Sequence, residues 1–265
     1  MVSYTEAKKA LNRVRTFDEN SQVFGIHYAN SGFTKDGESP KIVSIAVKSL
    51  SSKNEWLFSL SEELEERNIR PTDASESDFI EAEKDMLKNF SGFLVANERA
   101  KWLTWNMHKA NFGFQAISHR AKLLFKDEYE KLNLNFEIMD ENIMHMSMVV
   151  SQIYGDDYAD HPKLMKLREL NKIESARLLE GRDEVKAFST RELGTINDSV
   201  TSKVTSILTI YKLTRDKRLK VKKWALVKGT KWVDANRIFH ENSLLMKVIE
   251  TIVTMIIGAL IDRII

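Results

Sequence analysis

The sequence contains no cysteine among its 265 residues, which excludes disulfide bonds and thiolate metal sites. It has only 3 prolines and 10 glycines, so long disordered linkers are not expected. The first ten residues hold no apolar run of the kind that forms a secretory signal. With 43% hydrophobic residues, the chain is expected to form a folded domain in a reducing compartment.

Charge of one sign and the familiar catalytic motifs are also missing. The net charge is +2, too small by itself to imply a nucleic-acid partner. The sequence has no glycine-rich phosphate loop, no nucleophile elbow, no zinc-ligand spacing and no internal repeat. Function therefore has to be sought in local patterns.

The first half of the chain alternates between strand and helix patterns. A four-residue polar turn at 51–54 joins two strand patterns and predicts an antiparallel hairpin. A polar break at 71–77 precedes a long apolar stripe, with Ser75 or Ser77 as the N-cap. The expected strands are 22–28, 41–50, 55–60 and 101–105, and the expected helices are 3–17, 78–95 and 112–125.

After residue 127 the sequence predicts helices. The segment 140–154 is rich in methionine, which we interpret as flexible core filling rather than a methionine-based ligand site. Pro162 is expected to open a helix that ends near Leu170. Two further helices are expected, over 184–193 and from Asp198 onward.

The element order β-β-β-α-β-α, followed by helices, predicts an α/β fold with a ribonuclease-H-like mixed sheet. We expect this domain to occupy residues 1–213. A basic connecting segment is expected over 214–243, and a hydrophobic tail helix over 244–265.

Residues 22–213 resemble the DEDD-type exonucleases in part. Asn106 follows the strand W-L-T-W, as the second motif of that family requires, and Asp198 lies where the last motif places an aspartate. The first strand carries His27 where the family has an Asp-x-Glu pair. The resemblance implies His27, Asn106 and Asp198 as the candidate catalytic residues.

Two-metal cleavage of a phosphodiester needs several carboxylates, and this set offers one. We therefore predict a site that has lost metal catalysis, with no cofactor and no metal ligand. One alternative is a metal-dependent nuclease acting on single strands, which would use Asp198 with His27 and Asn106. Another is a site that uses His27, His108 or Asp198 for a different chemistry.

Three further segments resemble a family of uncharacterised bacterial proteins with a degenerate ribonuclease-H-like domain. They are W-N-M followed by N-F-G-F-Q-A-I-S-H-R, then I-Y-G-D-D-Y-A-D-H-P, and the late S-V-T-S-K-V. Lys109 stands where that family is expected to have an acidic residue. The resemblance implies a coherent chain and no established activity.

An acidic cluster precedes Pro162. Asp156, Asp157, Asp160 and His161 have side chains that bind metals, but four polar residues before a proline more often start a helix. We favour the helix-start interpretation.

A basic stretch follows at 215–231. Its central residues are expected to contact nucleic-acid phosphates or anionic lipid headgroups, unless they form a solvated face. They are Lys217, Arg218, Lys220, Lys222 and Lys223.

The last segment, 244–265, is the most apolar of the chain. As a helix it would span about 33 Å, close to the hydrocarbon thickness of a bilayer. Lys247 and Glu250 interrupt it near its start. The residues expected to contact lipid or another copy are Ile249, Ile252, Met255, Ile256 and Leu260.

Together these patterns predict a membrane-associated, non-catalytic nuclease-like domain on the cytoplasmic face of the inner membrane. It would act as a sensor, effector or interaction module in bacterial stress or phage defence. The alternatives are the nuclease described above and a soluble cytoplasmic protein whose tail forms a homo-oligomer.

Overall fold

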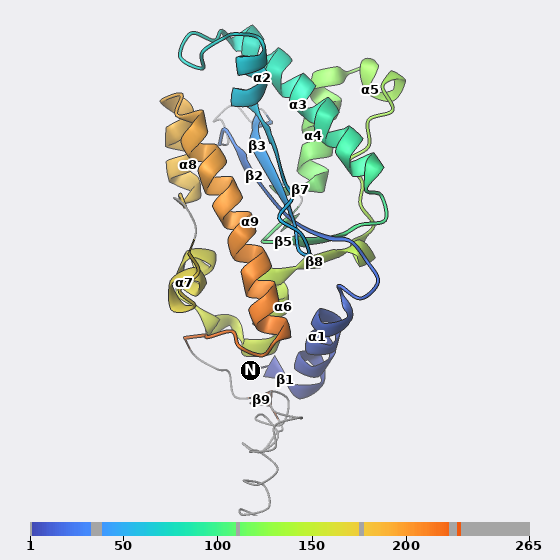
Figure 1. Cartoon of the computed structure of the whole chain (residues 1–265), viewed down its shortest axis with the longest axis vertical. Helices are drawn as coiled ribbons and strands as arrows, with labels where there is room; N and C mark the ends of the chain where they lie inside the picture. Colours follow the sequence, from blue (N-terminus) through green and yellow to red (C-terminus); the bar gives the residue numbers. More distant parts are fainter. Residues whose placement is uncertain (1, 33–38, 110–111, 175–177, 223–226, 229–265) are drawn as a thin grey trace, which may run out of the picture.

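The computed structural model describes residues 2–32, 39–109, 112–174, 178–222 and 227–228. The chain is an α/β protein built on a five-stranded mixed sheet with the order β4-β3-β2-β5-β8 (Figure 1). The strands are β2 (Val23–Asn30), β3 (Ile42–Ser49), β4 (Glu55–Ser59), β5 (Lys101–Thr104) and β8 (Ile143–His145). Strands β2, β3 and β4 are antiparallel neighbours, whereas β5 runs parallel to β2, and β8 runs parallel to β5.

The hairpin and the strand before it are confirmed. β3 and β4 pair antiparallel across the polar turn, and β2 begins one residue later and ends two residues later than expected. Nearly every residue of β2 and β3 is buried, because helices cover both faces of the sheet.

The fifth strand was not predicted. The sequence predicts mostly helix after residue 127 and no strand there, but Ile143–His145 form β8, which is followed by the helix Met146–Tyr154 (α6). A short apolar run has no periodicity that separates a buried strand from a buried helix.

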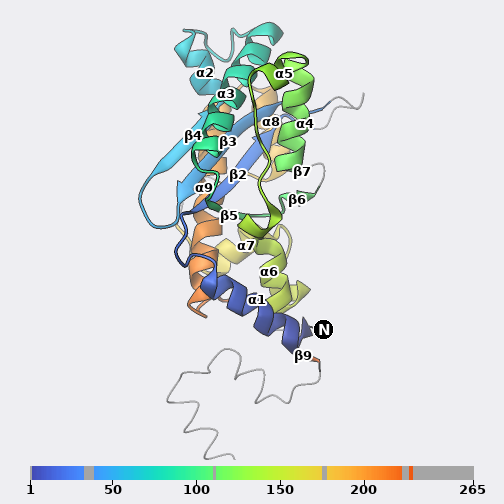
Figure 2. The ribbon, with the colours of Figure 1, turned by 90° about the vertical axis from the view of Figure 1, so that its right-hand side faces the viewer.

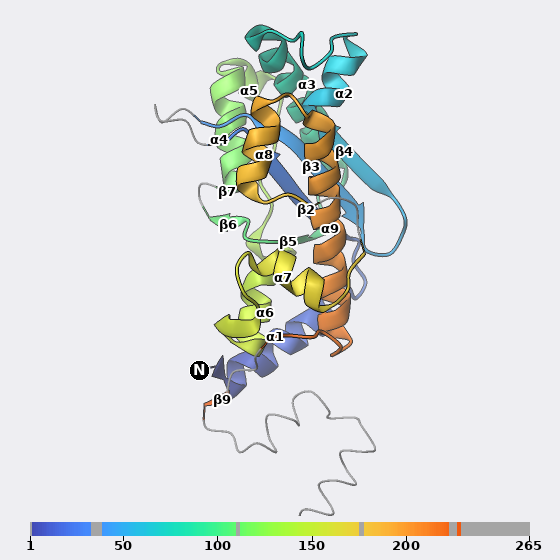
Figure 3. The same cartoon turned by 90° about the vertical axis from the view of Figure 1, so that its left-hand side faces the viewer.

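Helices form a layer on each face of the sheet (Figures 2 and 3). On one face, α9 (Leu193–Arg215) packs along β2 and β3, with α8 (Gly181–Ser189) beside it. On the other lie α3 (Glu76–Ala96) and α4 (Phe114–Phe125). Helix α9 begins five residues before Asp198, the predicted start, and α8 begins and ends earlier than the expected 184–193.

The remaining described elements complete the two ends of the molecule. Helix α1 packs against α6 and α9, while α2 packs against α3. The helices are α1 (Tyr4–Thr16), α2 (Leu60–Glu66), α5 (Glu128–Lys131), η1 (Asp140–Asn142), η2 (Asp156–Tyr158) and α7 (Lys163–Leu170). The short strands are β1 (Val2–Ser3), β6 (His108–Lys109), β7 (Phe112–Gly113) and β9 (Val227–Lys228).

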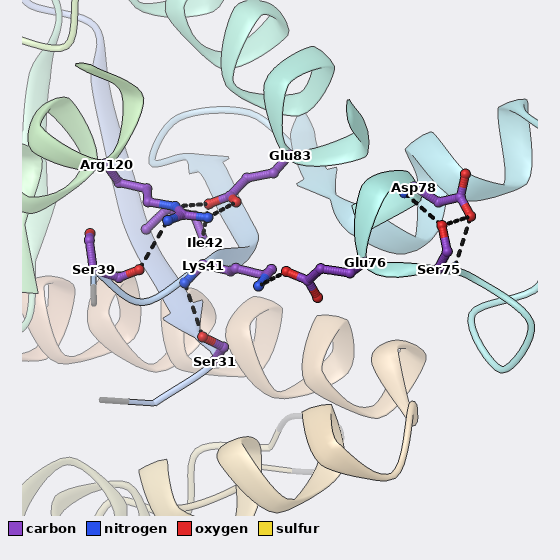
Figure 4. A network of polar contacts seen from close by, with 9 residues as sticks. All are labelled: Ser31, Ser39, Lys41, Ile42, Ser75, Glu76, Asp78, Glu83 and Arg120. Carbon is purple, nitrogen blue, oxygen red and sulfur yellow. Dashed lines mark hydrogen bonds and ion pairs between the residues drawn. The ribbon is translucent and has the colours of Figure 1, made fainter. Parts of the chain in front are cut away.

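Helix α3 begins where the sequence indicates. The Ser75 hydroxyl accepts a hydrogen bond from the Asp78 amide, and the Asp78 carboxylate accepts one from the Ser75 amide (Figure 4). This reciprocal capping satisfies two amides that would otherwise lack partners. Ser75, one of the two N-cap candidates, is thereby confirmed.

A buried ion pair ties α3 and α4 to the sheet (Figure 4). The Glu83 carboxylate accepts hydrogen bonds from Arg120 Nε at 2.9 Å and Nη2 at 2.6 Å, and from the Ile42 amide at 2.7 Å. Arg120 also donates to the Ser39 carbonyl. Burial raises the pKa of Glu83, and the Arg120 guanidinium opposes that shift.

Helix α9 approaches the sheet most closely at Gly25 of β2. A Cβ at this position would lie 2.8 Å from Cδ2 and Cγ of Leu208 and 3.1 Å from Cγ1 of Val204. Real Cβ atoms are rarely so close to another heavy atom, so glycine allows α9 to lie directly against β2.

We expect Gly25→Ala to lower the free energy of unfolding by roughly 1–3 kcal/mol, because the added methyl overpacks the contact between sheet and helix. Denaturant unfolding would measure the loss. Gly92→Ala is the matched control: no atom lies within 4 Å of a Cβ there, and Gly92 is exposed within α3. Because alanine favours helix, that variant should gain roughly 0.5–1 kcal/mol. Equal stability of the two variants would contradict the close approach.

The two ends of the described chain meet beside α1. Strand β1 pairs in parallel with β9, in the register Val2–Val227 and Ser3–Lys228.

The predicted tail helix 244–265 lies outside the described residues. Among the helices that the structure describes, none combines the length and apolar character needed to cross a membrane.

Candidate functional site

The carboxyl end of β5 opens beside the middle of β2. Along β2, the pairing with β5 covers residues 23–25, whereas β2 itself continues to Asn30. Because the two strands are parallel, the residues that follow β5 lie beside the second half of β2. Ligands of α/β proteins commonly bind beyond the carboxyl ends of such strands.

A cavity of about 660 Å³ lies at this position. It is lined by His27 from β2, Asn106 from the turn after β5, and Lys203 from α9. The remaining walls come from α6, η2, the start of α7 and the segment that leads into α8. Two of the three candidate catalytic residues, His27 and Asn106, therefore share one cavity.

His27 is buried, with 7% of its surface exposed, and its Nδ1 has no hydrogen-bond partner among the described residues. Burial lowers the pKa of His27 well below its usual value, and the nearby Lys203 ammonium lowers it further. Its ring lies 5.7 Å from that of Phe112. The imidazole is therefore neutral at physiological pH.

Lys203 is the buried charge of this site. Its Nζ lies 2.7 Å from Oε1 of Glu184, and that oxygen also accepts a hydrogen bond of 2.7 Å from the Ser199 hydroxyl. The Ser199 hydroxyl in turn accepts a hydrogen bond from the Leu179 amide at 3.0 Å. These contacts hold the start of α8 against α9 and fix the Lys203 ammonium beside His27.

Asn106 and Asp198 have different environments. Asn106 adopts a left-handed conformation, with φ of 58°, and is exposed at the cavity. Asp198 is exposed on α9 and is not among the residues that line the cavity. It precedes Lys203 by five positions, which is about 140° of helix rotation, so the two side chains leave α9 in different directions.

The acidic residues before Pro162 contact different partners and do not converge on one site. Asp156 lines the cavity and accepts a hydrogen bond from the Ser151 hydroxyl, while Asp160 pairs with Lys222 at 2.5 Å. Pro162 is the N-cap of α7 instead of its first residue. Within the described residues no group of three or more histidine or acidic side chains could hold a metal ion.

A second cavity, of about 920 Å³, lies on the other side of the turn after β5, and His108 lines both cavities. His145 lines this one, with its Nδ1 2.7 Å from the Thr104 hydroxyl and its ring 5.4 Å from that of His108. Burial, with smaller contributions from His108 and Arg13, lowers the pKa of His145 to about 4. His145 is therefore neutral as well.

The basic stretch begins as an extended segment held against α7. Asn171 exchanges two hydrogen bonds of 2.8 Å with the backbone of Lys220, and the Lys222 amide donates to the Tyr158 carbonyl. Leu219 is buried, whereas Arg218, Lys220 and Lys222 are exposed and Lys217 is partly buried. Lys223 lies outside the described residues.

In comparisons with known proteins, no family model and no curated protein matches this chain. The resemblance to the exonucleases and to the bacterial family stays a prediction.

The sequence patterns did not indicate Lys203 or Glu184 as site residues. A signal for Lys203 was nevertheless present, since it lies three residues after Val200 and four before Ile207 on the apolar stripe of α9. A charged residue on a buried stripe requires a partner, and Glu184 on α8 supplies it.

Proposed function

We propose that this chain is a ribonuclease-H-like domain whose central cavity binds a ligand instead of cleaving nucleic acid. We further propose that residues 244–265 attach it to a membrane, where it acts as a sensor or interaction module, for example in bacterial stress or phage defence. The observation that carries the non-catalytic part is the position of Lys203.

Lys203 brings a buried positive charge to the cavity shared by His27 and Asn106. A two-metal site requires carboxylates at such a position, because they hold cations about 3.5–4 Å apart. A buried ammonium repels divalent cations instead. Glu184, the nearest carboxylate to Lys203, is already engaged by that ammonium and by the Ser199 hydroxyl.

The arrangement of the sheet supports the ribonuclease-H-like assignment. Three consecutive antiparallel strands, β2 to β4, form one half of the sheet, and β5 and β8 continue it beside β2 in parallel. Along the chain, β2, β3 and β4 are followed by α2 and α3 and then by β5, which resembles the predicted order of three strands, a helix and a fourth strand.

The membrane part is supported by the sequence of 244–261 and by the position of the basic residues. Arg218, Lys220 and Lys222 are exposed along one extended segment that precedes the apolar tail. Basic residues next to an apolar segment are attracted to anionic headgroups.

We expect the full-length protein to remain in the membrane pellet through carbonate and high-salt washes. A version that ends at Ser243 should move to the soluble fraction, because it lacks the apolar segment. Fractionation followed by immunoblotting would measure this. If both versions were soluble, the membrane part of the proposal would be wrong.

A nuclease assay tests the proposal that the domain is non-catalytic. Single-stranded DNA or RNA incubated with the protein and Mg²⁺ or Mn²⁺ should remain intact. Cleavage that Asp198→Ala abolishes would instead favour the nuclease alternative, in which His27 and Asn106 act with Asp198.

A further inference from the structure

Three helices begin at the 660 Å³ cavity. Ser147 and Met148 from the first turn of α6, Lys163 and Leu164 from that of α7, and Gly181 at the start of α8 all line it. None of these three helices has a side-chain cap. First-turn amides lack acceptors within their own helix and lie at the positive end of its dipole. Such N-termini bind anions, phosphate groups in particular.

Polar atoms along the same cavity also lack partners. Nδ1 of His27 and Oγ of Ser147 are buried and make no hydrogen bond with any residue that the structure describes. Buried polar atoms are nearly always paired in folded proteins, so two exceptions on one cavity point to a polar ligand. This observation is independent of the helix N-termini.

The charge of the cavity changes with depth. Among the described residues, the carboxylates that line it are those of Asp156 and Glu180, and both residues are exposed. Lys203 is buried at 7% exposure, and the ammonium of the half-buried Lys163 lies 4.7 Å from the centre of the Tyr158 ring. Glu184 offsets part of the Lys203 charge, while the start of α8 adds to it. The interior therefore suits an anion, and the rim suits a neutral polar group.

A smaller cavity of about 640 Å³ adjoins the first on the far side of these residues. The two share His27, Gly181 and Lys203. The smaller cavity is lined by Val185 and by Phe112, whose ring stacks on Tyr28 at 4.4 Å, and also by Arg182 and Glu184. In Figure 3, α8 is seen beside α9 over the sheet, with α7 below it. An anion at the shared wall would thus have an apolar space beside it.

We propose that this pair of cavities binds an organic phosphate of about nucleotide size. The phosphate lies at the start of α8 beside Lys203, and the organic part enters the smaller cavity towards Phe112. Both volumes fall within the range of about 300–1,000 Å³ that is typical of small-ligand sites. This inference rests on the proposed ligand-binding function and names the ligand class for that site.

Gly181 provides a test that removes one amide and leaves the fold intact. It is the first residue of α8, a position where proline is tolerated, and the preceding Glu180 has the extended conformation, with φ of −70° and ψ of 159°, that proline requires. No atom of the described residues lies within 4 Å of a Cβ at Gly181. Gly181→Ala is the matched control, because it adds the Cβ and keeps the amide.

The full-length protein in mild detergent would be titrated with ATP and with pyrophosphate by calorimetry, with EDTA present. We expect ATP to bind with a Kd below the millimolar range and more tightly than pyrophosphate. Gly181→Pro should bind ATP roughly tenfold or more weakly, since hydrogen bonds to charged groups contribute about 1.5–3 kcal/mol. Gly181→Ala should stay within about threefold of the unmodified protein. Lys163→Gln, a second variant that leaves α8 unchanged, should also weaken ATP binding several-fold.

Equal affinities for Gly181→Pro and Gly181→Ala, or no binding of ATP, would overturn the assignment. Equal affinities for ATP and pyrophosphate would overturn the role of the smaller cavity. The chelator excludes metal-dependent cleavage, so failure of this titration is distinct from the fractionation and nuclease results that test the proposed function.

Discussion

Arg120→Met is expected to lower the free energy of unfolding by about 3–5 kcal/mol, because it leaves a charged carboxylate buried without its partner. Glu83 is fully buried, and two of its three hydrogen bonds come from Arg120. Losing the guanidinium would remove the ion pair that joins α3 to α4, and it would leave the Ser39 carbonyl without the hydrogen bond that Arg120 donates. Urea unfolding followed by tryptophan fluorescence would measure the change.

The double variant Glu83→Gln with Arg120→Met is the control. Glutamine keeps an acceptor for the Ile42 amide but carries no charge, so the double variant should be more stable than Arg120→Met alone.

The single variant Arg120→Met should also regain stability as the pH falls. Without the guanidinium, burial raises the pKa of Glu83 further above its unfolded value. The unfolding free energy is therefore lower at about pH 8 than at about pH 5. An Arg120→Met variant as stable as the double variant at both pH values would contradict the ion pair.

Lys203→Met is expected to have an effect of similar size, about 3–5 kcal/mol, for the same physical reason. Its partner Glu184 is buried, and within the described part of the chain only the Ser199 hydroxyl would still donate a hydrogen bond to Oε1. The start of α8 would then lose its tie to α9. Denaturant unfolding would report the loss of stability.

The rescue variant is Lys203→Met with Glu184→Gln, which keeps the acceptor for Ser199 and removes the charge. It should recover most of the stability, and it allows a second measurement. Because the Lys203 charge lowers the pKa of His27, the pKa in the rescued protein should rise while burial still keeps it below the usual value. Histidine NMR titration would measure this. An unchanged His27 pKa would mean that Lys203 does not face His27.

Much of the secondary structure follows from local patterns. The hairpin of β3 and β4 follows from two apolar runs and a polar turn, and α3 follows from Ser75 and an apolar stripe. Such features depend on neighbours within a few positions, so the sequence alone reveals them. The same patterns identified β5 and the polar turn at Asn106.

Two elements depended on contacts that local patterns do not contain. Residues 143–145 form a strand because they pair with β5, whose residues lie about forty positions earlier. Helix α9 begins at Leu193, and Leu193 and Ile196 are buried in the core, which the local pattern around them does not indicate.

The candidate site was determined in part by each level. The sequence itself placed His27 on the first long strand and Asn106 after β5, and these residues lie at one cavity because β2 and β5 are parallel neighbours. Only the tertiary structure decided that Lys203 and not Asp198 faces that cavity, and that Glu184 is its partner. The physical reason is that helical phase and long-range pairing set which side chain enters a buried site, whereas local composition sets only which element carries it.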